Sequence, residues 1–161
     1  MQLSNPKTIE FEVVRTSLLP GLMKCLQMNK GEPIPQKMFE LSDCCILDPQ
    51  GETGAQNIRK VAAVVIDLTA NFEVIHGLLD LIMNKVGADS EKKGRQYSLK
   101  QDDSDPRYFP TRGVQVLLGD KIVGSMGVIH PEVLGNFELK YPVSALELDF
   151  DALFAHFKSI Q

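Results

Sequence analysis

The side chains of this sequence that could do chemistry are three histidines, three cysteines and a pair of acidic residues near the C-terminus. A nucleophile–base pair could be assembled from Cys44 or Cys45 with His76 or His130, because an imidazole can activate a thiol for attack. No local pattern supports such a pair. Neither cysteine opens a predicted helix, and neither G-x-S-x-G nor a glycine-rich phosphate loop occurs. The sequence therefore shows no independent active site.

The acidic pair is Glu147 and Asp149, two residues apart in the run VSALELDF. On a strand these carboxylates share one face, as a catalytic carboxylate pair could. Leu146, Leu148 and Phe150 alternate with them. We therefore interpret Glu147 and Asp149 as the solvent-facing side of an amphipathic strand.

His130 stands between the apolar run GSMGVI and Pro131. Proline is suited to the first position of a helix, so a predicted strand ends at His130 and a short helix begins after it. A side chain at such a corner often hydrogen-bonds a free backbone group. We expect Gly127, His130 and Pro131 to mark a structural corner, and His130 to be neither a catalyst nor a metal ligand.

Composition narrows the class of protein. The chain has 161 residues, 43% of them hydrophobic and 24% charged, which is typical of one globular domain. Its net charge of −4 argues against a free nucleic-acid binder, which needs a basic face. The odd cysteine count and the absence of zinc-ligand spacing favour reduced, structural thiols. No apolar run reaches membrane-spanning length and the start lacks signal-peptide features, so we expect a cytoplasmic location.

The hydrophobic periodicity alternates between that of strands and that of helices. The strands are predicted over 8–14, 36–48, 58–69 and 143–150, the helices over 16–29, 71–87, 131–137 and 151–158, and a hairpin over 113–130. We expect Cys25 to lie on the core-facing side of the helix predicted over 16–29. We expect Gly77 to allow the helix predicted over 71–87 to pack closely against another element. These elements predict an α+β fold with a largely antiparallel sheet covered on one face.

Five stretches of the sequence occur in the order found in a known family. They are NPKTIEFEVVRTSLLPGLMKCLQMNK, KMFELSD, FEVIHGLLDLIM, GSMGVIHPEVLGNFEL and SALELDFDALF. Together they resemble the C-terminal part of the β subunit of phenylalanyl-tRNA synthetase, of the cytosolic, eukaryotic and archaeal type. The resemblance covers essentially the whole chain. It implies that residues 1–161 are a single domain, a C-terminal fragment of the catalytic-like module without that module's first helices, with a class II synthetase-like fold.

The resemblance also implies a function. The family's (αβ)2 holoenzyme joins phenylalanine to its tRNA using ATP and magnesium, and the catalytic-like module is a degenerate copy of the catalytic α subunit. A working class II site holds ATP phosphates with arginines, because guanidinium binds phosphate in a fork and stays charged. The stretches resembling the two arginine-bearing motifs, KMFELSDCC and SALELDFDALF, contain no arginine. We therefore expect a catalytically inactive structural and assembly module that supports the α subunit, contacts tRNA through the holoenzyme, and has no cofactor, metal or catalytic residue of its own.

Three further positions belong to the motif RTSLLPGL. We expect Arg15 to anchor the start of the following helix to the sheet rather than to bind substrate, and Pro20 and Gly21 to let that helix begin at a sharp angle. A different class of function stays open at this point. A free-standing α+β domain that binds a small molecule or transfers a group is the alternative hypothesis.

Overall fold

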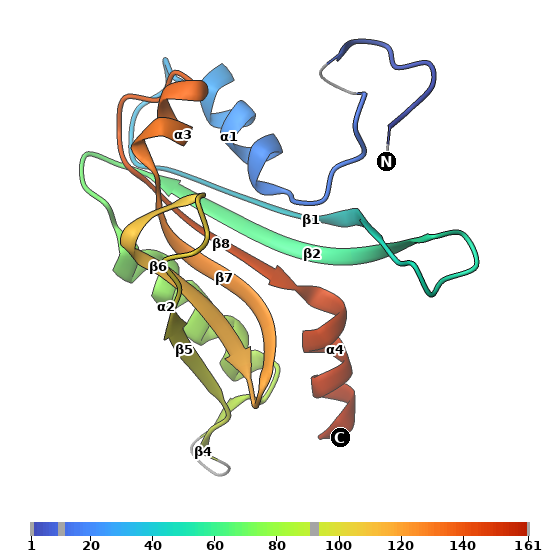
Figure 1. Ribbon diagram of the computed structural model, residues 1–161. Coiled ribbons are helices and arrows are strands. Elements are labelled where there is room, and N and C mark those ends of the chain that lie inside the picture. Colours follow the sequence, from blue (N-terminus) through green and yellow to red (C-terminus); the bar gives the residue numbers. More distant parts are fainter. Residues whose placement is uncertain (1, 10–11, 91–93, 161) are drawn as a thin grey trace.

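The computed structural model describes residues 2–9, 12–90 and 94–160. Its centre is a six-stranded antiparallel sheet with the spatial order β1-β2-β8-β7-β6-β5 (Figure 1). Its strands are β1 (Gln36–Leu47), β2 (Ala55–Ile66), β5 (Tyr97–Gln101), β6 (Tyr108–Leu118), β7 (Lys121–Ile129) and β8 (Val143–Asp149). A separate pair joins β3 (Asp89–Ser90) and β4 (Gly94–Arg95). The helices are α1 (Leu19–Met28), α2 (Phe72–Lys85), α3 (Pro131–Asn136) and α4 (Phe150–Ser159).

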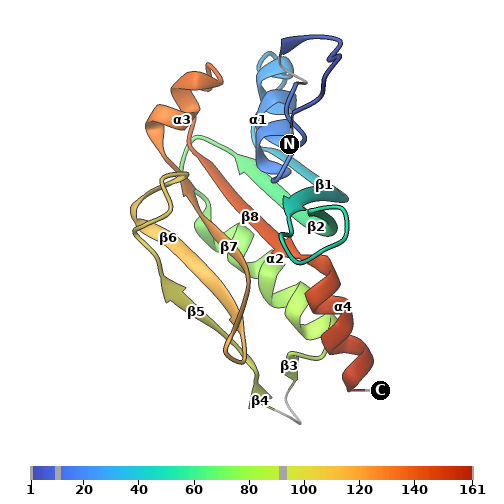
Figure 2. The same ribbon diagram turned by 45° about the vertical axis from the view of Figure 1, so that its right-hand side comes forward.

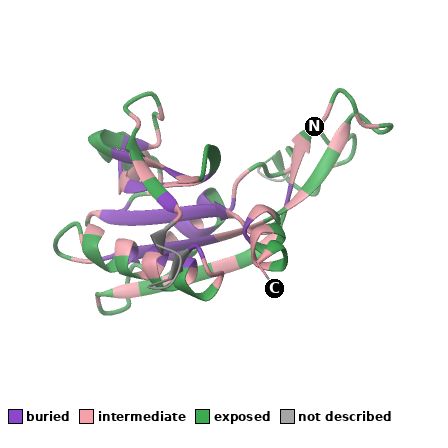
Figure 3. Cartoon of the chain, turned by 90° about the horizontal axis from the view of Figure 1, so that it is seen from below, coloured by how far each residue is buried: buried purple, intermediate pink, exposed green. Residues whose placement is uncertain are grey.

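The sheet has two halves joined by its last strand. β1 and β2 form one hairpin, and β5, β6 and β7 form a meander. β8 pairs with β2 on one side and with β7 on the other. The end of the β1–β2 hairpin that extends beyond the body is largely exposed, whereas the buried residues gather in the central strands (Figure 3).

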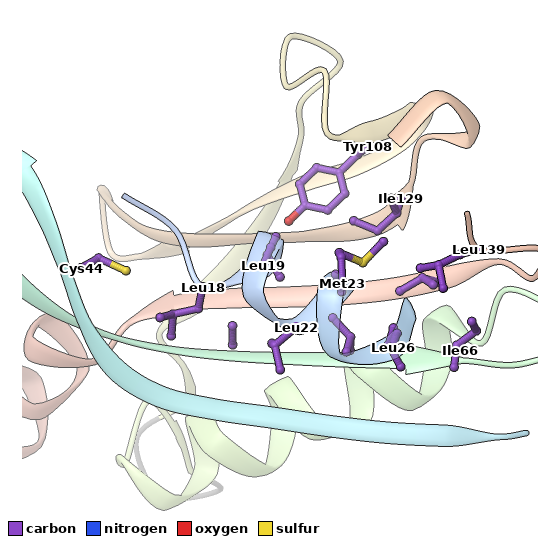
Figure 4. Close-up of a cluster of buried hydrophobic side chains, with 14 residues drawn as sticks. Leu18, Leu19, Leu22, Met23, Leu26, Cys44, Ile66, Tyr108, Ile129 and Leu139 are labelled. Carbon is purple, nitrogen blue, oxygen red and sulfur yellow. The ribbon is translucent and has the colours of Figure 1, made fainter. Parts of the chain in front are cut away.

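Helices cover both faces of this sheet. Along β2, Ala62, Val64 and Ile66 belong to a core beneath α1, while Ala63 and Val65 belong to a second core beneath α2. Figure 4 shows α1 and α2 on opposite sides of the strands, and α4 contributes to the α2 layer (Figure 2). The prediction of a sheet covered on one face is therefore wrong. Successive strand residues point to opposite faces, so an unbroken apolar run such as AAVVI requires cover on both.

The predicted positions of helices α1 and α2 and of the β6–β7 hairpin are confirmed. The segments 16–29 and 71–87 contain α1 and α2, and 113–130 contains β7 with most of β6. The hairpin turns at Gly119, whose φ of 59° lies in the left-handed region that glycine adopts without steric cost. The antiparallel α+β class is confirmed with them.

Three local predictions are wrong. Residues 8–14 form no strand where they are described; Ile9 is 87% exposed, and Val13 makes only an isolated bridge with Gln2. Phe11, part of the same prediction, lies outside the described residues. Cys25 is exposed, because the buried face of α1 is formed by Leu19, Leu22, Met23 and Leu26 and does not include residue 25. A Cβ at Gly77 would meet nothing within 4 Å, so this glycine allows no close approach.

Candidate functional site

A row of polar side chains crosses the sheet face that α1 covers. Glu147 of β8, Ser125 of β7 and Gln115 of β6 are successive cross-strand neighbours. Lys60 of β2 and Arg107, which precedes β6, complete the group. These residues line an open cavity of about 340 Å³, here called the polar cavity. It is the place where charged groups of the two halves of the sheet meet.

Glu147 is the centre of the polar cavity and is only 5% exposed. Its Oε1 accepts hydrogen bonds from the Ser17 hydroxyl at 2.8 Å and from the Leu18 backbone N–H at 2.7 Å. Its Oε2 lies 3.5 Å from the Lys60 ammonium and 3.4 Å from the Arg107 guanidinium. A buried carboxylate is tolerated only with such partners. Glu147 therefore fixes the start of α1 to β8 and shares its negative charge between two cations.

Arg107 forms ion pairs with Asp105 as well as with Glu147. Its Nε lies 2.9 and 3.0 Å from the two carboxylate oxygens of Asp105, and its Nη2 lies 3.1 Å from the Ser125 hydroxyl. Burial of Asp105 acts to raise the pKa of its carboxyl, but the hydrogen bonds from Arg107 outweigh it and leave that pKa below its ordinary value. The same hydrogen bonds are the main cause that raises the pKa of Arg107. Both groups are charged throughout the physiological pH range.

Ser125 is the one hydroxyl of the row that could act as a nucleophile. Its Oγ lies 3.0 Å from the phenol oxygen of Tyr108 and accepts from Arg107. Burial raises the pKa of Tyr108 to about 12, so the phenol stays protonated at neutral pH. A nucleophilic serine needs a base that can take its proton. Neither of these two hydrogen-bonding partners can do so.

His130 lies at the corner between β7 and α3. Its Nδ1 accepts a hydrogen bond from the Glu132 backbone N–H at 3.2 Å, and the backbone N–H of His130 donates to the Arg107 carbonyl at 2.9 Å. Its ring stacks on Phe109 with 6.2 Å between centroids. Pro131 is the first residue of the helix. The imidazole therefore caps α3, and the backbone of His130 connects this corner to the segment that carries Arg107.

Position 127 on β7 requires a glycine, because neighbouring atoms lie too close to leave room for a side chain. A Cβ there would lie 2.5 Å from the Arg112 carbonyl oxygen and 2.7 Å from the Tyr108 ring. Pro20 lies in the first turn of α1, where no intrahelical N–H is lost. A Cβ at Gly21 would make an ordinary contact with Glu40 at 3.7 Å.

Arg15 lies on the outer side of β1, away from the polar cavity. It donates to the Glu40 carboxylate at 2.8 Å, to the Ser42 hydroxyl and to the Asp43 carbonyl at 3.1 Å. The Cys45 N–H donates to the Arg15 carbonyl at 3.0 Å. The segment that leads into α1 is thus held along the first strand.

The remaining candidate residues are dispersed. Cys44 is buried in the α1 core, where burial raises the pKa of its thiol, while His76 is on α2 on the opposite face. The sheet separates this pair. Asp149 caps α4 by accepting from the Ala152 N–H at 2.9 Å. The prediction that Glu147 shares a solvent-facing side with Asp149 is wrong, because α1 covers that face of β8.

Sequence reasoning missed most of the polar cavity. Asp105 and Arg107 lie in a polar stretch, Lys60 and Ser125 lie in predicted strands, and nothing local marks any of the four. A signal for Glu147 does exist. The run VSALEL is apolar on both of its faces, which predicts a strand without a solvent side, so a carboxylate within it must have partners.

Metal and membrane features are not found in the described part of the chain. No group of three or more His, Cys, Asp or Glu residues in 2–9, 12–90 and 94–160 is arranged to hold a metal ion. No helix in the same ranges is long and apolar enough to span a membrane.

Comparison with known proteins gives one consistent family. Residues 1–150 match the model described as the phenylalanyl-tRNA synthetase beta chain CLM domain. The phenylalanine–tRNA ligase beta subunit of Drosophila melanogaster is 45% identical over 94% of this chain and 26% of its own length. The human subunit is 42% identical over 92% and 25%, and that of Methanocaldococcus jannaschii is 34% identical over 94% and 26%. The chain thus spans about a quarter of the length of these relatives.

Solved structures identify the fold. The crystal structure of pyrrolysyl-tRNA synthetase from Desulfitobacterium hafniense superposes with a TM-score of 0.69 at 17% identity, over 87% of this chain and 48% of that one. A second pyrrolysyl-tRNA synthetase structure from the same organism gives 0.62 at 19%. At this identity the likeness concerns the fold alone. It is consistent with the class II-like architecture expected from the sequence.

Proposed function

Because this chain belongs to the phenylalanyl-tRNA synthetase beta chain family, we propose that it is a non-catalytic structural and assembly module of a phenylalanine–tRNA ligase β subunit. In this proposal the module supports an α subunit that attaches phenylalanine to its tRNA with ATP and magnesium. The assembly is an (αβ)2 heterotetramer in the cytoplasm, and tRNA is contacted by the holoenzyme. The module contributes no catalytic residue, cofactor site or metal site.

The observation that carries the proposal is the state of the cations in the polar cavity. Phosphate binding needs guanidinium or ammonium groups that are available to the ligand. Arg107 is bound to Asp105 and Glu147, and Lys60 is bound to Glu147 and to the Thr16 carbonyl at 2.9 Å. Asp102 and Asp149 also line the cavity. An incoming triphosphate would meet more carboxylates than cations and would have to break existing ion pairs.

The arginines next to β1 support the same conclusion. Arg59 pairs with Asp43 through two contacts, Nε–Oδ1 at 2.8 Å and Nη2–Oδ2 at 3.1 Å, and Arg15 pairs with Glu40. Both guanidinium groups brace β1 against its neighbours. Their contacts are those of structural side chains rather than of a phosphate clamp.

Thermal unfolding with ligands tests catalytic silence. The melting temperature of the chain is measured with Mg-ATP, with phenylalanine, and with both together. We expect no saturable increase, because a ligand stabilises a protein only by binding its native state. A stabilisation that saturates at millimolar ligand or below contradicts the proposal and favours a small-molecule-binding domain. The charge-reduced variants Asp105→Asn and Glu147→Gln are the comparison, since freeing the cations should increase any weak anion binding.

Co-purification tests the assembly role. The chain and a version extended upstream are each co-expressed with the α subunit from the same source. Retention of α by either form supports an assembly module, and the difference between them locates the contact. If neither form retains α while both are folded by circular dichroism, the assembly role is wrong.

A further inference from the structure

β1 is an outer strand of the sheet, so one of its two hydrogen-bonding edges has no partner strand (Figure 1). Alternate residues of such a strand bond to the neighbouring strand, and the residues between them point their backbone N–H and C=O groups outward. Arg15 bonds two outward groups from outside the sheet. Its carbonyl accepts from the Cys45 N–H at 3.0 Å, and its Nε donates to the Asp43 carbonyl at 3.1 Å. One residue thus satisfies a donor and an acceptor of the open edge, as the main chain of an added strand would.

The rest of the Arg15 guanidinium holds this contact in place. It donates to the Glu40 carboxylate at 2.8 Å and to the Ser42 hydroxyl. Glu40, Ser42 and Cys44 share one face of β1, because they are two residues apart, and Cys44 belongs to the α1 core. The guanidinium therefore reaches from the edge of the strand onto the face that α1 covers. A planar guanidinium can donate in several fixed directions at once, whereas a lysine ammonium is a compact point charge.

Arg15 divides the open edge of β1, which is 12 residues long. With the outward groups of 43 and 45 occupied, the stretch 37–41 stays open, and within the residues that the structure describes nothing bonds its outward backbone groups. Phe39 is 78% exposed and Leu41 is 48% exposed, so this stretch is apolar. Lys37 stands at its start. Short edges and edge lysines are two ways in which natural sheets avoid pairing with the strands of other chains.

We propose that Arg15 blocks strand addition at β1: by occupying the outward groups of 43 and 45, it leaves an edge too short to accept a strand of another chain. This inference is independent of the function proposed above. It also goes beyond anchoring α1, because it concerns what β1 can bind. The Arg15 and Glu40 side chains are 45% and 31% exposed, and a surface ion pair contributes little to the stability of a fold. Loss of Arg15 should therefore change self-association far more than stability.

Hydrogen exchange of the unmodified chain tests whether the edge is covered. The backbone amides of Phe39, Leu41 and Cys45 all point outward from the same edge. After correction for intrinsic rates, we expect the Cys45 amide to exchange about tenfold more slowly than the other two, because only Cys45 has an acceptor. In Arg15→Ala the Cys45 amide should lose most of this protection. Equal exchange of the three amides in the unmodified chain overturns the proposal.

Sedimentation velocity tests the consequence for association, since the strands available in a solution of the purified chain are those of other copies. We expect Arg15→Ala to self-associate about tenfold more tightly than the unmodified chain. Arg59→Ala is the matched control. Arg59 is also an exposed arginine that pairs with a residue of β1, Asp43, but it lies on β2, which has partner strands on both edges. Equal association of the two variants contradicts the proposal.

A second substitution separates blocking of the edge from anchoring of α1. Leu41→Lys places a charge on the open edge without restoring any contact of Arg15. We expect the double variant Arg15→Ala, Leu41→Lys to return to the association of the unmodified chain, because a lysine on an edge opposes strand pairing. If the double variant associates as strongly as Arg15→Ala, Arg15 acts as an anchor only and the proposal is wrong. Circular dichroism checks that each variant is folded. Should Arg15→Ala unfold, Arg15→Lys takes its place in both comparisons, since it keeps the cation and loses the planar fork.

Discussion

Replacing Glu147 by alanine is the most direct test of how the two ends of the chain are held together. The carboxylate is buried and accepts bonds from Ser17 and Leu18, while its other oxygen faces Lys60 and Arg107. Glu147→Ala removes every one of these contacts. It leaves a buried backbone N–H without an acceptor and two cations without their shared anion.

The size of the effect follows from these contacts. Removing one member of a buried ion pair typically costs about 3–5 kcal/mol. Lys60 and Arg107 keep 19% and 39% of their side-chain exposure, so water compensates part of the loss. We therefore expect Glu147→Ala to lower the free energy of unfolding by about 2–4 kcal/mol. Glu147→Gln keeps the shape and one acceptor oxygen but loses the charge, so about 1–2 kcal/mol is expected.

Urea denaturation followed by circular dichroism measures both values, and Glu52→Ala in an exposed turn is the control that should change little. Hydrogen exchange of the Leu18 amide adds a local readout, because its acceptor is lost only in the alanine variant. The reasoning is refuted if Glu147→Ala stays within about 0.5 kcal/mol of the parent chain, a typical surface effect. It is also refuted if the glutamine variant is the less stable of the two.

Three further outcomes follow from local geometry. Gly127→Ala should lower the free energy of unfolding by about 1 kcal/mol or more, the typical cost of overpacking, because the new Cβ would overlap the Arg112 carbonyl. Gly77→Ala, in open space on a helix, should raise the free energy of unfolding by about 0.5–1 kcal/mol. Chemical denaturation of the two variants checks these opposite signs. Asp149→Ala removes the α4 cap and should cost about 1 kcal/mol in the same measurement. The raised pKa of Tyr108, about 12, means that its phenol contributes stability that is fully present below pH 10 and is lost as the pH rises through 12. Ultraviolet titration should show a late tyrosine phase whose amplitude falls in Tyr108→Phe.

The local sequence pattern was enough to predict those elements whose own residues indicate what they pack against or pair with. α2 has a wide apolar stripe that must pack on something, and β6 and β7 are joined by a turn that fixes their pairing. The segment 8–14 shows the limit of this reasoning. Its alternation is compatible with a strand, but a strand needs a neighbour, and alternation does not say whether one is available.

The polar cavity shows a second limit. Glu147 was predicted to face water because its strand was assumed to have a solvent side. Whether that side exists depends on α1, which is more than a hundred residues earlier in the chain. Burial of a polar residue is set by tertiary cover, so only the apolar character of both faces of β8 could have predicted it.

The position of β8 has a consequence for how the protein is made. It is the last strand along the chain, yet it lies third across the sheet, between β2 and β7. On the ribosome, the β1–β2 hairpin and the β5–β7 meander emerge first. Each then has an apolar edge strand whose pairing partner, β8, has not yet been synthesised. The bonds from Glu147 to Ser17 and Leu18 close loops of 130 and 129 residues, so α1 is secured only after β8 has been synthesised. Nascent chains that stop before Val143 should therefore aggregate or bind chaperones, and this sheet should form only once β8 is available.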